Sequence, residues 1–145
     1  MAERRRSIHT GHRQRVKDEF SARGLAGWPD HRVLELLLYY AIPQGDVNGL
    51  AHELVERFGS LAGVLDAAEE ELCRVPGVGQ HTAVLLKLIP AAGARYLQSR
   101  ADLGEPVRRT EDAYALLEPY FFGARNEMIY LLALDGKNKP LGVRK

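Results

Sequence analysis

The residues best suited to chemistry form a short turn with two glycines, Val75-Pro76-Gly77-Val78-Gly79, between two apolar segments. Glycine has no Cβ, so its backbone takes positive φ without strain and leaves nearby amides uncovered. A helix that begins directly after such a turn also presents unpaired N–H groups and the positive end of its dipole. We therefore expect positive φ at Gly77 and Gly79, and we expect the turn to bind an anion such as a nucleic-acid phosphate.

The flanks of this turn fit a helix-hairpin-helix motif, because apolar residues recur at helical spacing on both sides. They are Leu65, Leu72 and Val75 before the turn and Ala83, Leu86 and Ile89 after it. A glycine-rich helix connection without a ligand is the alternative, but the apolar residue between the glycines and the downstream alanine favour a DNA-backbone contact. The predicted contacts are Val75, Gly77, Val78, Gly79, Gln80, His81, Thr82 and Lys87.

The N-terminal end of the chain is basic, with Arg4, Arg5 and Arg6 followed by further cations up to Lys17. We add Arg13 and Arg15 to the predicted DNA contacts, with an ordinary solvated helix face as the equal alternative. The net charge of the chain is only +1, whereas nucleic-acid-binding domains are usually strongly basic. Any DNA binding must therefore be local.

Metal chemistry, a disulfide framework and a membrane partner are not expected from the composition. His9 and His12 have the spacing of metal ligands, but no cysteine or third histidine nearby completes a site. Cys73 is the single cysteine, and its apolar neighbours indicate a buried, unreactive thiol. No apolar stretch is long enough to span a bilayer, and none follows the N-terminal arginines as in a signal peptide. We expect a cytoplasmic protein with no membrane contact.

The segment from Arg13 to Leu97 is predicted to be almost wholly helical. Breaks are expected at residues 24–29, 41–46 and 59–60 and at the hairpin, with Ser60 as a helix N-cap. The apolar residues between Val33 and Leu38 surround their helix almost completely, so this helix should lie in the centre of the core.

A weak internal repeat suggests that the hairpin is duplicated. Gly45, Ala51 and Leu54 each precede a residue of the same type by 32 positions, namely Gly77, Ala83 and Leu86. Val47 stands where the second copy has Gly79, so the first copy is expected to have lost the exposed-amide turn and to serve packing.

After Tyr96 the pattern changes from helix to linker and then to strand. Residues 99–109 are polar, a short helix should run from the cap Thr110 to about Pro119, and the apolar run Met128 to Leu134 predicts a strand buried on both faces. Pro140 to Val143 is the expected return strand. An isolated hairpin is marginal in water, so we interpret this part as the opening of a truncated domain, or as a piece that docks on the helices or self-associates through its strands.

The predicted fold class is therefore mainly α, a pseudo-duplicated helix-hairpin-helix bundle followed by a short α+β piece. Four motifs follow one another along the chain: His9 to Arg15, Leu36-Leu37-Leu38-x-Tyr40-Ala41-Ile42-Pro43, Phe58-Gly59-Ser60 and the Val75 to Gly79 hairpin. Together they resemble the RadC family, and the resemblance covers essentially the whole chain. The resemblance implies a helix-hairpin-helix DNA-binding domain in residues 1–107 and the N-terminal fragment of a JAMM (MPN-type) metallohydrolase-like domain in residues 108–145. It also implies a DNA-repair label and a zinc-dependent peptidase activity for the intact family.

Within the JAMM pattern, a glutamate just before an apolar strand acts as general base beside zinc, which a later His-x-His and an aspartate hold. Glu127 matches that glutamate, but no histidine follows His81. The zinc ligands are thus missing, and we expect a vestigial Glu127, no metal or other cofactor in this chain, and no catalysis. The family hairpin often has a basic residue soon after its second glycine, whereas this chain has Gln80 and His81, which lowers the expected DNA affinity.

Three interpretations follow from these residues: a non-specific DNA-binding module, a fragment of a zinc metallopeptidase, and a helical protein-interaction domain that binds no nucleic acid. The first fits the chain best. A helix-hairpin-helix glycosylase does not fit, because nothing supplies the larger helical domain around a base-flipping pocket.

Overall fold

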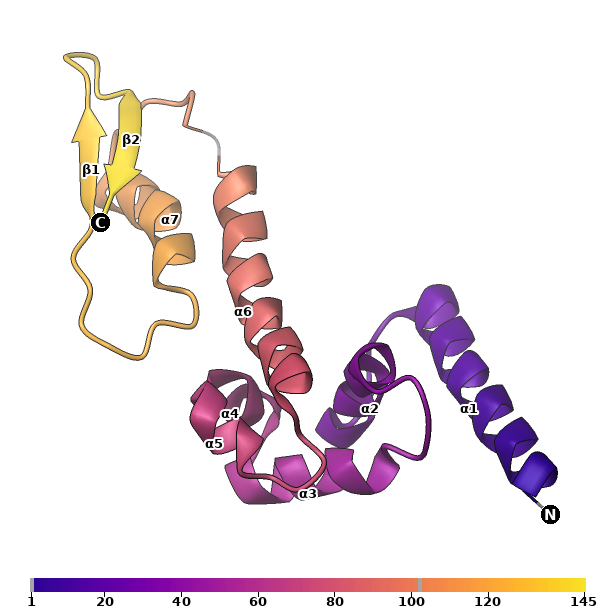
Figure 1. Ribbon diagram of the computed structural model, residues 1–145. Coiled ribbons are helices and arrows are strands. Elements are labelled where there is room, and N and C mark those ends of the chain that lie inside the picture. Colours follow the sequence, from indigo (N-terminus) through magenta and orange to yellow (C-terminus); the bar gives the residue numbers. More distant parts are fainter. Residues whose placement is uncertain (1, 102) are drawn as a thin grey trace. The chain divides into compact units, whose positions relative to one another are not determined.

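A computed structural model describes the backbone of residues 2–101 and 103–145 and the side chains of residues 11–101 and 103–145 (Figure 1). The predicted contributions of Arg4, Arg5, Arg6 and His9 fall outside the described side chains. The described residues form seven helices and a C-terminal antiparallel hairpin, as predicted. The helices are α1 Ala2–Arg23, α2 Asp30–Ala41, α3 Asn48–Phe58, α4 Leu61–Asp66, α5 Glu69–Cys73, α6 Gln80–Arg100 and α7 Thr110–Phe121. The strands are β1 Leu131–Leu134 and β2 Pro140–Arg144.

The chain forms two compact units, residues 1–87 and residues 88–145. The division falls within α6, upstream of the predicted domain boundary at residues 107/108. The helix itself runs to Arg100, beyond the expected start of the polar linker at Ser99. None of the described helices is both long enough and apolar enough to cross a membrane.

The helix breaks predicted at residues 24–29, 41–46 and 59–60 are confirmed, whereas the break at Ala67 and Ala68, between α4 and α5, was not predicted. Ser60 accepts a hydrogen bond from the amide of Gly63 at 3.0 Å and so caps α4 as expected. Gly59, which ends α3, takes a φ of +88°, and its amide donates to Val55 O at 2.8 Å. A left-handed glycine just after a helix is a common C-terminal stop.

The core of the first unit draws an apolar residue from each of its six helices. The middle of α2 contributes most, with Leu34 and Leu38 fully buried and Leu36 nearly so, as the all-round apolar pattern predicts. The other helices add Val16, Leu54, Val64, Leu72 and Leu86. Each fully buried leucine or valine contributes roughly 1.5–3 kcal/mol relative to an exposed one.

A charged residue, Glu35, is buried on α2 between α1 and α3 with 4% of its surface exposed. Its carboxylate accepts a hydrogen bond from His12 Nε2 at 2.8 Å, one from Asn48 Nδ2 at 3.0 Å, and one from the hydroxyl of Tyr39. Burial alone would raise the pKa of Glu35, but the bonds from Tyr39, Asn48 and His12 outweigh it, so this pKa lies below its ordinary value. The network joins α1, α2 and α3, and the sequence analysis did not predict it.

The second unit contains α7 and the β-hairpin. The antiparallel register pairs Leu131 with Arg144 and Leu132 with Val143, with an irregularity between Ala133 and Leu134. On α7, Tyr120 and Phe121 contact the ring of Tyr130 at centroid distances of 5.4 and 5.0 Å. The helix begins at Thr110 with Arg109 as N-cap, so the expected cap at Thr110 is displaced by one residue.

The expectation of a strand buried on both faces from Met128 to Leu134 is wrong for this structure. The strand is limited to Leu131–Leu134, and only Leu132 of its four side chains is even partly buried. A run of apolar residues is buried on both faces only when other elements cover both faces of its sheet. Among the described residues, β1 has β2 as its one partner strand.

The Glu35 network predicts an acid-sensitive first unit. The pKa of Glu35 is lower in the folded than in the unfolded chain, whose value is near 4.5. The unfolded chain thus binds more protons in this window, and the free energy of unfolding falls as pH drops from about 4.5 towards the folded pKa. Glu35→Gln should remove about 1.5–3 kcal/mol at neutral pH and flatten this decline. Urea unfolding across a pH series measures both effects.

The exposed glutamate Glu56 on α3 provides the control for that measurement. Glu56→Gln should leave the neutral stability within about 0.5 kcal/mol of the parent. Equal losses in the two variants would show that the buried carboxylate does not join the helices as described.

Candidate nucleic-acid interface

The turn between α5 and α6 is anchored by two valines and exposes its glycines. Val75 and Val78 are buried in the core, whereas Gly77 and Gly79 are exposed. The amide of Val78 donates to Val75 O at 3.0 Å and closes the turn. The valines therefore hold the turn through their side chains, and the chain presents backbone to solvent between and after them.

The two glycines differ in conformation. Gly77 takes a φ of +92°, as predicted, and a Cβ there would meet the Leu50 side chain at 3.6 Å. The expected positive φ at Gly79 is wrong, because its backbone is not in the left-handed region. Gly79 instead caps α6, since its carbonyl accepts a hydrogen bond from Ala83 N at 3.0 Å. An N-cap residue normally has extended backbone, which any residue can adopt. The lack of a side chain at Gly79 thus matters for access and not for backbone strain.

The first turn of α6 offers three amides, those of Gln80, His81 and Thr82. Such groups have no acceptor within their own helix, and no described residue outside the helix accepts from them. The side chain of Thr82 is buried and that of His81 is exposed. Gln80 turns away from the amides, because its Nε2 donates to Glu69 on α5. An anion placed before α6 would therefore meet unpaired donors.

The side chain of Gln80 also approaches Cys73, whose Sγ lies 3.9 Å from Gln80 Oε1. Cys73 is a free thiol and is partly exposed. The expectation of a buried cysteine is therefore met only in part, since Cys73 packs against the core but keeps part of its surface exposed.

The turn between α2 and α3 repeats the backbone of the second hairpin. Gly45 has a φ of +90°, close to the +92° of Gly77. Ala51 N donates to Val47 O at 2.9 Å, as Ala83 N does to Gly79 O at 3.0 Å. The four core positions of the repeat, Ala51, Ala83, Leu54 and Leu86, are all fully buried. The internal repeat is thus a repeat of structure as well as of sequence.

The two turns differ in what occupies the helix start. In the first, Asp46 Oδ1 accepts from the amide of Asn48 at 2.9 Å. The residue 32 positions later is Val78, an apolar side chain buried in the core. In the first turn, the carboxylate of Asp46 therefore occupies an amide at the start of α3, so an external anion has no such donor to bind there. In the second turn, the amides at the start of α6 are unpaired. This agrees with the prediction that the first copy serves packing.

Two of the predicted cationic contacts are engaged inside the protein. The Arg13 guanidinium donates to Ile42 O at 2.7 Å and to Gly45 O at 2.6 Å, and it lies 4.7 Å from the centre of the Tyr39 ring. Lys87 Nζ donates to Leu65 O at 2.7 Å. Both cations thus satisfy carbonyls at or near helix ends. Arg15, by contrast, is exposed.

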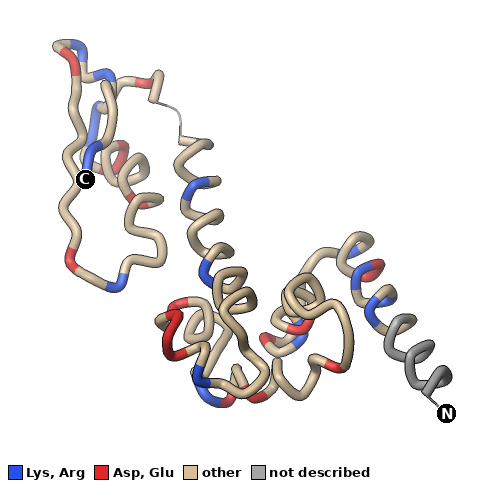
Figure 2. Tube along the Cα trace, viewed as in Figure 1, with Lys and Arg blue, Asp and Glu red and all other residues tan. Residues whose placement is uncertain are grey.

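Sequence reasoning did not single out Arg74, which is exposed and immediately precedes the anchoring Val75. Its position one residue before the turn was the available signal. Acidic residues Glu69, Glu70 and Glu71 gather in the first turn of α5, and Figure 2 shows Lys and Arg spread along the chain among acidic positions. The local field around the hairpin is therefore mixed, which limits the attraction of a phosphate.

Glu127 is exposed in the segment before β1. Within the described part of the chain, no group of three or more His, Cys, Asp or Glu side chains could hold a metal ion. The residues present do not fit the zinc site that the JAMM resemblance implies.

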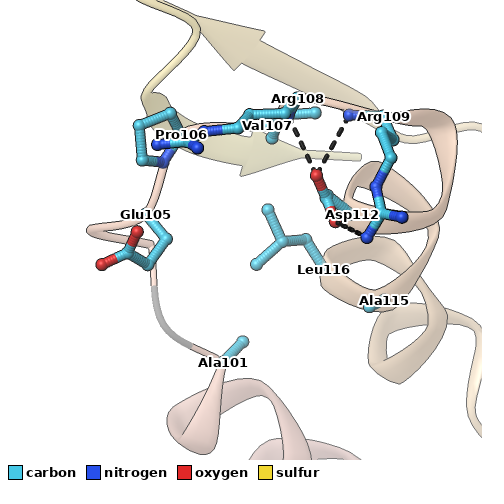
Figure 3. Close-up of a pocket in the computed structure, with 9 residues that line it drawn as sticks. All are labelled: Ala101, Glu105, Pro106, Val107, Arg108, Arg109, Asp112, Ala115 and Leu116. Atoms are coloured by element: carbon cyan, nitrogen blue, oxygen red, sulfur yellow. Dashed lines mark hydrogen bonds and ion pairs between the residues drawn. The ribbon is translucent and has the colours of Figure 1, made fainter.

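The second unit has an open pocket of about 700 Å³ beside the start of α7 (Figure 3). Asp112 accepts there from the amides of Arg108 and Arg109, both at 3.0 Å, and its Oδ1 lies 3.7 Å from the Arg109 guanidinium. The backbone hydrogen bonds hold the pKa of Asp112 below its ordinary value. The Asp112 carboxylate thus already accepts hydrogen bonds from the backbone and pairs with Arg109, so it is not available to bind a ligand in this pocket.

Comparison with known proteins identifies relatives of the N-terminal part of the chain. A stretch of 79 residues, 54% of the chain, is 38% identical to a UPF0758 protein of Fusobacterium nucleatum. A stretch of 89 residues, 61% of the chain, is 39% identical to a UPF0758 protein of Ruegeria pomeroyi. The N-terminal part of the chain is homologous to UPF0758 proteins. These proteins are RadC-like, so the resemblance is confirmed over about three fifths of the chain.

The matches to the two UPF0758 proteins cover 34% and 40% of the relatives' own lengths. The chain thus spans well under half of the curated relatives it matches. No protein-family model and no solved structure matches the chain.

The different conformations of the two glycines predict different costs of a methyl group. Gly77→Ala places a Cβ on a left-handed residue and should lower the free energy of unfolding by about 1–2 kcal/mol. Gly79→Ala should change it by less than about 0.5 kcal/mol, because an added Cβ there meets nothing within 4 Å. Urea unfolding of the two variants makes the comparison, and a greater loss in Gly79→Ala would contradict the assigned backbone.

Proposed function

We propose that the first unit binds the sugar-phosphate backbone of DNA through the second hairpin, without reading the base sequence. The observation that carries the proposal is the difference between the two repeated turns. The first turn holds its own carboxylate, Asp46, whereas the first turn of α6 presents unpaired amides next to two exposed glycines. A helix start with free amides and a positive dipole end favours a phosphate.

The predicted residues take different parts in this contact. The amides of Gln80, His81 and Thr82 are the donors, and Gly79 keeps the approach to them open. Val75 and Val78 support the turn from within the core. Arg15, and Arg74 in addition to the predicted residues, are exposed and supply positive charge, and the exposed side chain of His81 offers a further polar group. Backbone amides meet phosphates and not base edges, so the contact carries no sequence preference.

The binding should be weak, because two of the predicted cationic contacts already bond to carbonyl groups of the protein. Arg13 and Lys87 donate to carbonyls of the protein itself, which turns two predicted phosphate contacts into structural braces. Glu69, Glu70 and Glu71 stand on the neighbouring α5 and oppose an approaching phosphate. Few phosphates are then neutralised, and a correspondingly small salt dependence follows.

In the longer relatives, we infer that a module of this kind is joined to a JAMM (MPN-type) domain that residues 108–145 would open. The DNA-repair label and the zinc-dependent peptidase activity of the RadC resemblance belong to that intact arrangement. Glu127 is exposed, and within the described part of the chain no cluster of metal-ligating side chains accompanies it. The function proposed for the residues described is DNA-backbone binding.

The affinity of the full chain for duplex DNA should fall with salt. With about 2–4 phosphate contacts, log K plotted against log salt should have a slope of roughly −2 to −4. Fluorescence anisotropy with labelled duplexes measures the slope. Two duplexes of unrelated sequence should bind equally, and either salt-independent affinity or strong sequence discrimination would overturn the proposal. Absence of binding at low salt would favour a protein-interaction domain instead.

A variant at Gly79 separates the amide contact from the stability of the fold. Gly79→Asp places a carboxylate at the start of α6, one residue after the position equivalent to Asp46, where an N-cap side chain accepts from the amides of the first helical turn, so it should occupy the free amides. We expect stability equal to the Gly79→Ala control or up to about 2 kcal/mol higher. We also expect DNA affinity to fall at least about tenfold, because the phosphate loses its donors and meets a negative charge.

Both variants are compared by urea unfolding and by anisotropy. Gly79→Ala should retain most of the parental DNA affinity, since it adds no acceptor. A stable Gly79→Asp protein that binds DNA as the parent does would show that the start of α6 is not the contact.

A further inference from the structure

Two histidine side chains from neighbouring helices stack on each other in the first unit. His31 on α2 and His52 on α3 have ring centres 4.0 Å apart, with an angle of 22° between the ring planes. His52 is exposed and His31 is partly exposed. Among the described residues, no hydrogen bond reaches either ring. Each neutral imidazole therefore keeps one nitrogen lone pair for a ligand from outside the chain.

A buried hydrogen bond between the same two helices sets the position of this pair. Asn48 Nδ2 on α3 donates to the carboxylate of Glu35 on α2 at 3.0 Å. His31 is four residues before Glu35, and His52 is four residues after Asn48, so the helices run antiparallel here. Residues four apart lie on one face of a helix. The histidines thus form the next contact along the same seam, and the core positions both of them.

The separation of the two rings is close to the separation that a shared metal ion requires. Imidazole nitrogens bind zinc at about 2.0–2.1 Å, so two rings on one ion have centres roughly 4.5–5.3 Å apart for bond angles between 90° and the tetrahedral value. The observed separation is 4.0 Å. The outer ring, that of His52, is exposed, and a histidine ring turns readily about its Cβ–Cγ bond. Small movements therefore bring both lone pairs onto one ion.

The charged side chains beside the pair do not oppose a cation. Two exposed glutamates of α3, Glu53 and Glu56, lie within about one helical turn of His52. Arg32, which adjoins the other histidine in sequence, is ion-paired with Glu19 on α1. An ion bound between the rings would thus approach carboxylates and a guanidinium that already has its counter-charge.

We propose that His31 and His52 together bind one divalent ion of the late first-row transition metals, with water in its remaining coordination positions. Imidazole nitrogen suits copper, nickel and zinc, whereas magnesium and calcium prefer oxygen ligands. The ion links α2 to α3 beside the buried contact of Glu35. Because the unfolded chain does not hold the two rings together, ion binding stabilises the folded first unit.

This site differs from the zinc site that the JAMM resemblance implies, because neither histidine belongs to that pattern. Two protein ligands are involved, fewer than in the larger clusters that the described residues lack. The site also departs from the sequence-based expectation of no metal. That expectation considered His9 and His12, which are close in sequence, and did not consider ligands from two separate helices. The proposal does not depend on the DNA contact of the second hairpin.

Calorimetric titration of the full chain with Ni²⁺ at neutral pH tests the site. His31→Ala and His52→Ala should each weaken Ni²⁺ binding at least about tenfold. The double variant should lose little more than either single variant, because one ion needs both rings and the two losses are not additive.

Thermal unfolding gives a second measurement. At a free Ni²⁺ concentration about ten times the dissociation constant, the melting temperature of the parent should rise by roughly 5–10 °C. The rise should disappear in both single variants at that concentration. Each variant is compared with its own metal-free melting temperature, so a change in basal stability does not enter the result.

His81→Ala is the matched control, because His81 is an exposed histidine on a different helix of the same unit. This variant should bind Ni²⁺ as the parent does. In NMR spectra of the parent, Zn²⁺ should shift the ring-proton signals of His31 and His52 and leave those of His81 unchanged. A stack with only a packing role would show no such selective shift.

A parent chain that shows neither binding nor stabilisation at about 1 mM Ni²⁺ overturns the proposal. So does an affinity that survives unchanged in His31→Ala or His52→Ala, because the ion then binds elsewhere. An equal loss in His81→Ala would also overturn it, since the stacked pair would then not be the site.

Discussion

The first unit depends on how one buried carboxylate is satisfied. Glu35 lies on α2, is almost completely buried and is bonded to residues of α1, α2 and α3. Removing any of its hydrogen-bond donors would leave the carboxylate either as an incompletely paired buried charge or as a protonated acid. Its donors come from α1 (His12), from α2 itself (Tyr39) and from the start of α3 (Asn48). Directional bonds of this kind fix how the helices sit on one another, whereas leucine contacts alone tolerate sliding and rotation. The residue that starts α3 is thereby held at the first hairpin.

The two hairpins show how a repeated backbone can serve different ends. Both turns place a left-handed glycine before a helix and pack an alanine and a leucine one and two turns further on. The first is closed from within by Asp46 and braced by Arg13 on Gly45 O, so its polar groups are consumed by the fold. The second is anchored by two buried valines and closed by the hydrogen bond from Val78 N to Val75 O, and neither satisfies the amides that start α6. The amides at the start of α6 therefore remain free to bind an anion, whereas Asp46 occupies an amide at the start of α3.

Local signals made much of the fold predictable. Helix stops at Gly59 and at the hairpin, the cap at Ser60 and the buried core of α2 depend on residues close in sequence. The bonds from His12 and Asn48 to Glu35 and the bracing by Arg13 and Lys87 join residues 13 to 32 positions apart, and no periodicity indicates them. Gly79 was misjudged because a glycine is permitted many conformations, and only the bond from Ala83 shows which one is used. The exposure of β1 depends on which elements cover it, and its own residues do not specify those elements.

The attachment of α1 has a thermodynamic character of its own. Among its described side chains, only Val16 is buried, and several of its other contacts are polar or cationic: His12 with Glu35, Arg13 with carbonyls, Glu19 with Arg32, and Lys17 4.8 Å from the centre of the Tyr40 ring. Detaching this helix would expose little apolar surface, and so would bring only a small change in heat capacity and a small denaturant m-value. Salt and pH, more than urea or temperature, would then control whether this helix is docked. Polar and charged contacts therefore contribute much of the attachment of α1, whereas the rest of the first unit is stabilised mainly by buried apolar side chains.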